Sequence, residues 1–161
     1  MRWIRHLAAS SRVKRLFPGS ALQAIHKAIT AGEARHSGQL CFAIENSLPL
    51  RDLARNRTPR ERAHEVFAQL RVWDTEHNSG VLIYVLLAER AIEIVADRGI
   101  AAKVSQSEWT SICERMQQRY AAREFERGSL DGITAVNDLI AAHFPPEPGK
   151  KNELPDRPVL L

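Results

Sequence analysis

The sequence predicts a single α/β domain, a three-layer sandwich with a small mixed β-sheet flanked by helices on both faces. Three observations carry this prediction. The chain has 161 residues, the size of one domain. Strand, helix and strand patterns follow one another over residues 39–87, which is typical of a crossover between parallel strands. Residues 81–87 are unbroken apolar, as in a strand that is covered on both faces.

The first elements are indicated by periodicity and capping residues. Ser20 is the predicted N-cap of a helix whose apolar face holds Leu22, Ile25 and Ile29. Residues 40–45 alternate in the period of two that is typical of a strand. In the helix that follows, Thr58 and Glu61 form a predicted capping box around Pro59, ahead of the apolar positions Ala63, Val66, Phe67 and Leu70.

The second half contains a hairpin and two helices. A predicted turn at Glu89 and Arg90 joins the apolar strand to an alternating strand over residues 92–97. A second capping box, SQSE at 105–108, begins a helix with an apolar stripe, and a last helix follows Gly128 and ends near His143.

The predicted organisation is a basic leader (1–17), the α/β domain (18–144) and a Pro-rich extended tail (145–161). The leader holds five basic residues and no acid, which leaves 18 basic against 19 acidic groups elsewhere. A duplex-binding domain concentrates basic charge on a folded face, so no specific nucleic-acid partner is expected. The leader lacks the apolar stretch of a secretory signal, but it can rest on an anionic membrane surface or a membrane complex.

The composition is that of a soluble globular chain, with 44% hydrophobic and 26% charged residues. The longest apolar run, residues 81–88, is far shorter than the ~20 residues that cross a bilayer. Cys41 and Cys113 lie within apolar patterns and are interpreted as free buried thiols in a reducing compartment. The sequence therefore predicts a cytoplasmic protein. Phosphate-loop, zinc-protease and nucleophile-elbow spacings are absent from it.

Oxygen-bearing side chains at predicted strand ends indicate a site for a hard divalent cation, Ca²⁺ or Mg²⁺. The candidate ligands are Asp97, Asp74, Asn78 and Glu45. Asp97 and Asn78 are expected at one edge of the sheet. If the first two strands are parallel, Glu45 lies at the opposite end, and the direction of the first strand is left open.

Each candidate also has a structural interpretation. Asp97 can be a turn residue that accepts a hydrogen bond from its own backbone, and Asp74 and Asn78 can be loop caps. Glu45 can form an ion pair with one of three nearby arginines, Arg51, Arg55 or Arg57. The loop arginines themselves are either a solvated face or an anion-binding patch.

Several segments together resemble the TPM domain family, which includes thylakoid-lumen phosphatase-like proteins, photosystem II repair proteins and a nematode acetylcholine-receptor accessory protein. They are RAHEVF (62–67), WDT (73–75), NSGVLIY (78–84) and VADRGI (95–100). The resemblance covers residues 20–144. HFP (143–145) with NELP (152–155) is similar to the ending of a short bacterial branch.

The resemblance implies an α/β sandwich, a divalent-cation site, often for calcium, and an acid phosphatase activity that is not general in the family. The matching positions are Asn78, Gly80, Asp97 and Gly99, with Asp74 and Glu45 less closely matched. The chain departs from many members in lacking a signal sequence and a C-terminal membrane span.

Two functions are therefore expected from different classes. The first is a divalent-cation-binding or protein-interaction module, associated with a membrane complex through the leader or tail. The alternative is a metal-assisted acid phosphatase that acts on small phosphomonoesters, although the sequence shows no dedicated nucleophile.

Overall fold

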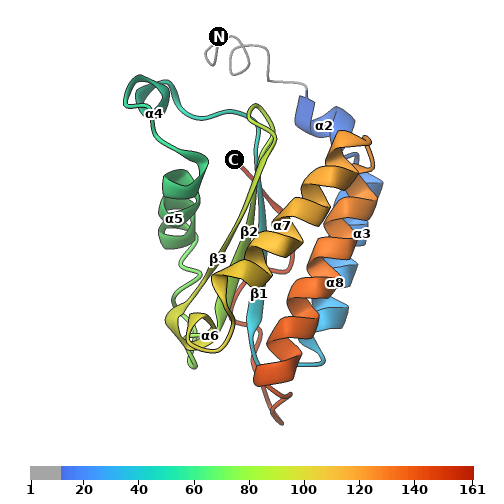
Figure 1. Ribbon diagram of the computed structural model, residues 1–161. Coiled ribbons are helices and arrows are strands. Elements are labelled where there is room, and N and C mark those ends of the chain that lie inside the picture. The colour runs from blue at the N-terminus through green and yellow to red at the C-terminus, as the bar shows by residue number, and fades with distance from the viewer. Residues whose placement is uncertain (1–11) are drawn as a thin grey trace.

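The computed structural model describes residues 12–161 (Figure 1). The elements are α2 (Arg12–Leu16), α3 (Gly19–Glu33), β1 (Gln39–Glu45), α4 (Leu50–Ala54), α5 (Pro59–Gln69), β2 (Gly80–Leu86), β3 (Ala91–Ala96), α6 (Arg98–Ala101), α7 (Gln106–Ala121), α8 (Phe125–His143) and β4 (Val159–Leu160).

The sheet has the order β3-β2-β1-β4. β1 and β2 are parallel over their whole length, from Gln39 opposite Gly80 to Glu45 opposite Leu86. β3 is antiparallel to β2, and β4 is parallel to β1. The predicted crossover and hairpin are confirmed. Because β1 and β2 are parallel, their carboxyl ends lie together at one end of the strands and their amino ends lie together at the opposite end.

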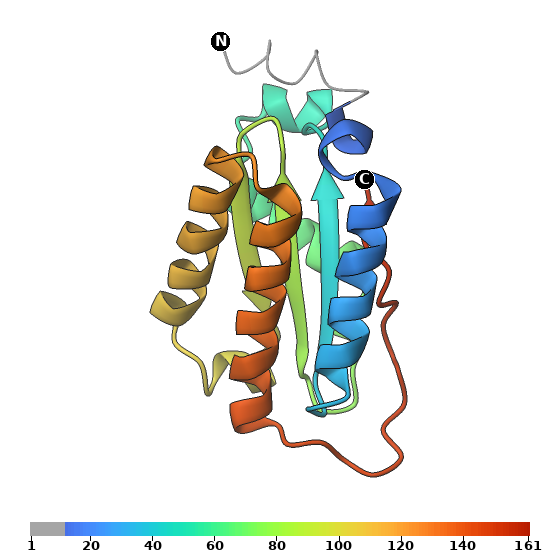
Figure 2. The ribbon, with the colours of Figure 1, turned by 90° about the vertical axis from the view of Figure 1, so that its right-hand side faces the viewer.

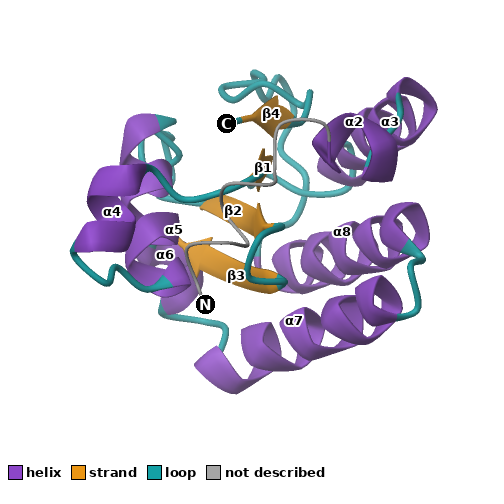
Figure 3. Cartoon of the chain, turned by 90° about the horizontal axis from the view of Figure 1, so that it is seen from above, coloured by secondary structure: helices purple, strands orange, loops and turns teal. Residues whose placement is uncertain are grey.

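Helices cover both faces of the sheet (Figure 3). Alternate β1 residues, Leu40, Phe42 and Ile44, belong to the core cluster on the side of α3, α7 and α8. The residues between them, Cys41 and Ala43, belong to the second cluster, which includes Ala63 and Val66 of α5. The three-layer sandwich predicted from the apolar strands is confirmed.

Both predicted capping boxes are present. Thr58 and Glu61 bond reciprocally at the start of α5, and Ser105 and Glu108 do the same for α7. The prediction of Ser20 as N-cap of α3 is wrong, because α3 begins at Gly19 and the N-cap is Pro18. The fixed φ of proline, −63°, combines with an extended ψ of 164° to give an N-cap backbone without a side-chain bond.

Three short helices, α2, α4 and α6, were not predicted, since four or five residues hold too little periodicity to indicate a helix. Helix α8 begins at Phe125, before the predicted start after Gly128. Gly128 lies within this helix, and a Cβ there would stand 2.7 Å from Cβ of Arg119 on α7. The close approach of α7 and α8 therefore requires glycine at this position.

The C-terminal tail contributes strand β4 to the sheet. Residues 1–11 of the predicted leader lie outside the described residues, and residues 12–16 form α2. No helix among residues 12–161 is both long and apolar enough to cross a membrane. Cys41 and Cys113 are free, and burial raises the pKa of each thiol to about 12.

Candidate functional site

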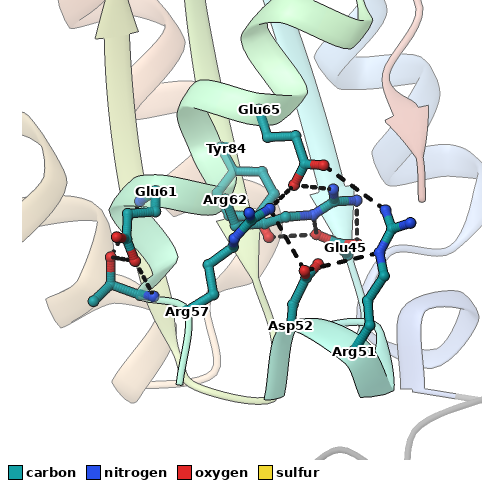
Figure 4. Close-up of polar contacts among 9 residues, drawn as sticks. Glu45, Arg51, Asp52, Arg57, Glu61, Arg62, Glu65 and Tyr84 are labelled. Carbon is teal, nitrogen blue, oxygen red and sulfur yellow. Dashed lines mark hydrogen bonds and ion pairs between the residues drawn. The ribbon is translucent and has the colours of Figure 1, made fainter. Parts of the chain in front are cut away.

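Polar side chains gather at the carboxyl ends of β1 and β2, where Glu45 is the last residue of its strand (Figure 4). Its Oε1 accepts a hydrogen bond from Nη2 of Arg62 at 2.8 Å, and its Oε2 accepts from Nε of Arg62 at 2.9 Å. The hydroxyl of Tyr84 donates to Oε2 at 2.5 Å. The predicted ion pair of Glu45 is therefore present, but its partner is Arg62 of α5 and not Arg51, Arg55 or Arg57.

The network extends from this pair toward α4 (Figure 4). Nη1 of Arg62 donates to Glu65 at 2.9 Å, and Glu65 also accepts from Arg57. The buried carboxylate of Asp52 lies 3.5 Å from Nη1 of Arg57 and 3.8 Å from Nε of Arg51. Three carboxylates thus face three guanidinium groups, and the charges balance.

The pKa values of Arg62 and Tyr84 are both shifted further from neutral pH. The hydrogen bonds that Arg62 donates to Glu45 raise the pKa of the Arg62 guanidinium above its ordinary value. Burial, with a smaller effect from Glu45, raises the pKa of Tyr84. Because Arg62 stays charged, Tyr84 stays neutral and donors occupy both oxygens of Glu45, this cluster acts as a buried support that joins α5 to the carboxyl ends of β1 and β2.

A second polar group lies at the opposite end of the sheet, around Asp97, which follows β3. Oδ1 of Asp97 accepts a hydrogen bond from the backbone N–H of Arg98 at 2.7 Å and caps α6. The backbone N–H of Asp97 donates to the carbonyl of Gly80 at 2.8 Å. Oδ2 is buried and accepts no hydrogen bond from any of residues 12–161. The structural role expected for Asp97 therefore accounts for only one of its two carboxylate oxygens.

The loop before β2 lies directly beside Asp97. Gly99 donates its backbone N–H to the carbonyl of Asn78 at 3.0 Å. A Cβ at Gly99 would stand 2.6 Å from that carbonyl oxygen and 2.7 Å from the carbonyl oxygen of His77, so only glycine permits the approach. Asn78 has a positive φ of 51°, a conformation that asparagine tolerates better than most residues. Two of the four predicted ligands, Asn78 and Asp97, are thus brought together.

The other two predicted ligands are engaged elsewhere. Glu45 lies at the far end of the parallel strand pair, paired with Arg62. The exposed carboxylate of Asp74 pairs with Arg71 at 2.5 Å. No group of three or more His, Cys, Asp or Glu side chains placed to hold a metal occurs within residues 12–161.

Comparison with known sequences identifies the group to which this architecture belongs. A sequence model of the TPM domain matches residues 13–139. The chain belongs to the TPM domain family. No curated protein matches the chain at a significant level.

Two solved structures show the same TPM-domain architecture as this chain. One is the NMR structure of the BA42 protein from the psychrophilic bacterium Bizionia argentinensis. It is 27% identical, with a TM-score of 0.77 over 90% of this chain and 95% of that one. The other is the solution NMR structure of the N-terminal domain of a protein from P. gingivalis. At 15% identity and a TM-score of 0.65, covering 82% of this chain and 83% of that one, it supports the fold alone.

The Glu45–Arg62–Tyr84 cluster of this TPM domain is the feature that sequence reasoning missed. One signal was available: Tyr84 is the single hydroxyl-bearing residue of the apolar strand β2. A buried tyrosine hydroxyl needs a hydrogen-bond partner, and such a partner must come from another element. Arg62 stands in the first turn of α5, on the buried side that also holds Ala63 and Val66.

Proposed function

We propose that this TPM domain is a divalent-cation-binding module whose site is centred on Asp97 and the loop at Asn78. The observation that supports it is the buried Oδ2 of Asp97, which has no hydrogen-bond donor within residues 12–161. A desolvated carboxylate oxygen without a partner costs free energy, and a bound cation would offset that cost.

The chemistry of the neighbouring groups suits a hard cation. Asp97 would supply a carboxylate, and Asn78, whose backbone carbonyl accepts a hydrogen bond from Gly99, carries an amide oxygen in the adjacent loop. Calcium accepts irregular sets of carboxylate, amide and carbonyl oxygens, whereas magnesium demands near-ideal octahedral geometry. With one carboxylate in the set, the expected dissociation constant for Ca²⁺ is on the order of 10⁻⁴–10⁻³ M.

Titration of the full chain with Ca²⁺ and Mg²⁺, followed by calorimetry and by amide NMR shifts, tests the proposal. Asp97→Asn is a well-defined variant because asparagine caps helices as well as aspartate does, so α6 keeps its cap while the carboxylate is lost. The expected result is saturable Ca²⁺ binding that weakens at least tenfold in this variant. Asp138→Asn, a change in an exposed pair with Arg35, is the matched control. Equal binding by wild type and Asp97→Asn contradicts the proposal.

A metal-assisted phosphatase is the second candidate, and His77 is the observation that favours it. This residue lies in the loop beside Asp97, with Nε2 3.1 Å from a carboxylate oxygen of Glu147. A histidine oriented by a carboxylate is suited to general base catalysis, and a cation at Asp97 would polarise a phosphoryl oxygen. Hydrolysis of p-nitrophenyl phosphate with and without Ca²⁺ or Mg²⁺ tests it, and a rate no higher than that of Asp97→Ala would exclude this activity.

A further inference from the structure

The C-terminal segment, residues 150–161, lies against α3 and the outer edge of β1, as a peptide ligand would (Figure 2). β4 pairs with β1 at two positions, Ala43 opposite Val159 and Ile44 opposite Leu160. The backbone N–H of Leu161 donates to the carbonyl of Ile44 at 2.9 Å. Strand addition to an exposed edge is a common mode of peptide recognition.

Lys150 anchors the start of this segment at the end of α3. Its Nζ donates to the carbonyl oxygens of Gly38 at 2.6 Å, His36 at 3.2 Å and Glu33 at 3.3 Å. The carboxylate of Glu33 lies 3.9 Å from the same nitrogen. The carboxyl end of a helix carries partial negative charge, so an ammonium group is favourable there.

The middle of the segment is recognised through both backbone and side chains. Oε1 of the buried Gln39 accepts hydrogen bonds from the backbone N–H groups of Glu153 and Leu154, each at 3.1 Å. Leu154 is buried in the core cluster on the α5 side of the sheet. The hydroxyl of Thr30 on α3 donates to Asp156 at 2.5 Å. These contacts join positions more than 110 residues apart in the sequence.

The connection between α8 and this segment is short and exposed. Residues 145–149 are all exposed, and three of the five are proline. Gly149 has a φ of 76°, with open space around it. Proline-rich chain extends about 3.1 Å per residue, so this connection spans roughly 15 Å when extended.

We propose that the α3–β1 surface also takes the C-terminal segment of a second copy of this chain, which gives a segment-exchanged dimer. The contacts of the segment are all noncovalent, and the short exposed connection is its covalent link to α8, so the same segment from a neighbouring copy can satisfy every one of them. The extended connection is long enough to reach a neighbouring copy in which the carboxyl end of α3 lies close to the carboxyl end of α8 in the first copy. The effective concentration of a closely linked segment is in the millimolar range, so exchange requires protein at about 1 mM.

Exchange of the C-terminal segment requires its release from the closed monomer, so variants that weaken its contacts should change the rate of dimer formation. Other modes of dimerisation do not predict this effect. The full chain is incubated at about 1 mM, diluted and fractionated by size with light scattering. Wild type is expected to yield a dimer that survives dilution. Lys150→Ala is expected to speed dimer formation by roughly 10- to 150-fold, because loss of hydrogen bonds to a charged group costs about 1.5–3 kcal/mol and eases release of the segment. The final dimer fraction stays the same, since the closed and exchanged forms share their contacts.

Lys151→Ala is the matched control, because Lys151 is the exposed neighbour of Lys150; its dimer should form at the wild-type rate. Thr30→Val, which removes the hydrogen bond to Asp156, is the second variant and should accelerate dimer formation by a smaller factor. A wild-type chain that stays monomeric after incubation overturns the proposal. A dimer whose rate of formation is the same in wild type, Lys150→Ala and Thr30→Val also overturns it.

Discussion

Replacing Arg62 by methionine tests the role of the charge network at the carboxyl ends of β1 and β2. The side chains of Arg62 and Glu45 are 7% and 5% exposed, so both charges are desolvated. The variant keeps much of the side-chain volume but removes both hydrogen bonds from Arg62 to Glu45. Glu45 then remains as a buried carboxylate with Tyr84 as its hydrogen-bond donor. Breaking a buried pair from one side costs ~3–5 kcal/mol of unfolding free energy.

That loss is a large fraction of the roughly 5–15 kcal/mol by which domains are stable. For a domain of this size it corresponds to a fall in Tm of roughly 6–20 °C. Urea unfolding followed by tryptophan fluorescence measures the loss. The matched control is Arg35→Met, because the Arg35–Asp138 pair is 51% and 57% exposed and should be worth less than ~1 kcal/mol.

The double variant Glu45→Gln with Arg62→Met separates two contributions to the loss of unfolding free energy: the burial of an unpaired charge and the interaction between the paired charges. It should cost less than the two single variants added together, since no uncompensated buried carboxylate remains. A cost for Arg62→Met as small as that for Arg35→Met would refute the reasoning that this network is a buried support.

Three further predictions concern stability. Burial raises the pKa of Glu33 from 4.5 to about 7, so its contribution to stability is present below pH 4.5 and is lost as the pH rises through 7. The unfolding free energy of wild type, measured with urea, should fall by an amount on the order of 3 kcal/mol between pH 4.5 and pH 8. Glu33→Gln should abolish this fall, and a variant with the same pH dependence as wild type would contradict the prediction. Gly80→Ala should destabilise by ~3 kcal/mol or more, because its Cβ would stand 1.9 Å from the carbonyl oxygen of Val72; Gly19→Ala, with open space around it, is the thermal-melt control. Thr58→Ala should cost ~1 kcal/mol by loss of the α5 cap, measured by urea unfolding, and Thr58→Ser should restore most of that loss.

Elements with local signals could be predicted from the sequence. Thr58, Pro59 and Glu61 mark the start of α5 because cap and helix are neighbours in the chain. The unbroken apolar strand β2 indicated a sheet covered on both faces. The strand–helix–strand order is typical of a parallel crossover, but it leaves the direction of β1 open, and the structure shows β1 to be parallel to β2. These signals were sufficient for the fold class and for the proximity of Asn78 and Asp97.

The partners of the buried charges could not be predicted in the same way. Three arginines close in sequence to Glu45 were equally plausible partners, yet the guanidinium that reaches it belongs to Arg62. The choice depends on which side of α5 faces the sheet and on where α5 lies along β1, and neither is a property of neighbouring residues. The buried oxygen of Asp97 likewise becomes visible only when the loop at Asn78 is packed against Gly99.

The sequence by itself determined the helices and strands that have regular apolar periods, the two capping boxes and the layered α/β architecture. Only the tertiary structure decided that Glu45 pairs with Arg62, that Lys150 binds the end of α3 and that the tail adds strand β4 to the sheet. The physical reason is that periods and caps arise from interactions within a few residues along the chain. Ion pairs, edge strands and buried unpaired oxygens arise where distant segments meet, and their geometry exists only once the core has packed.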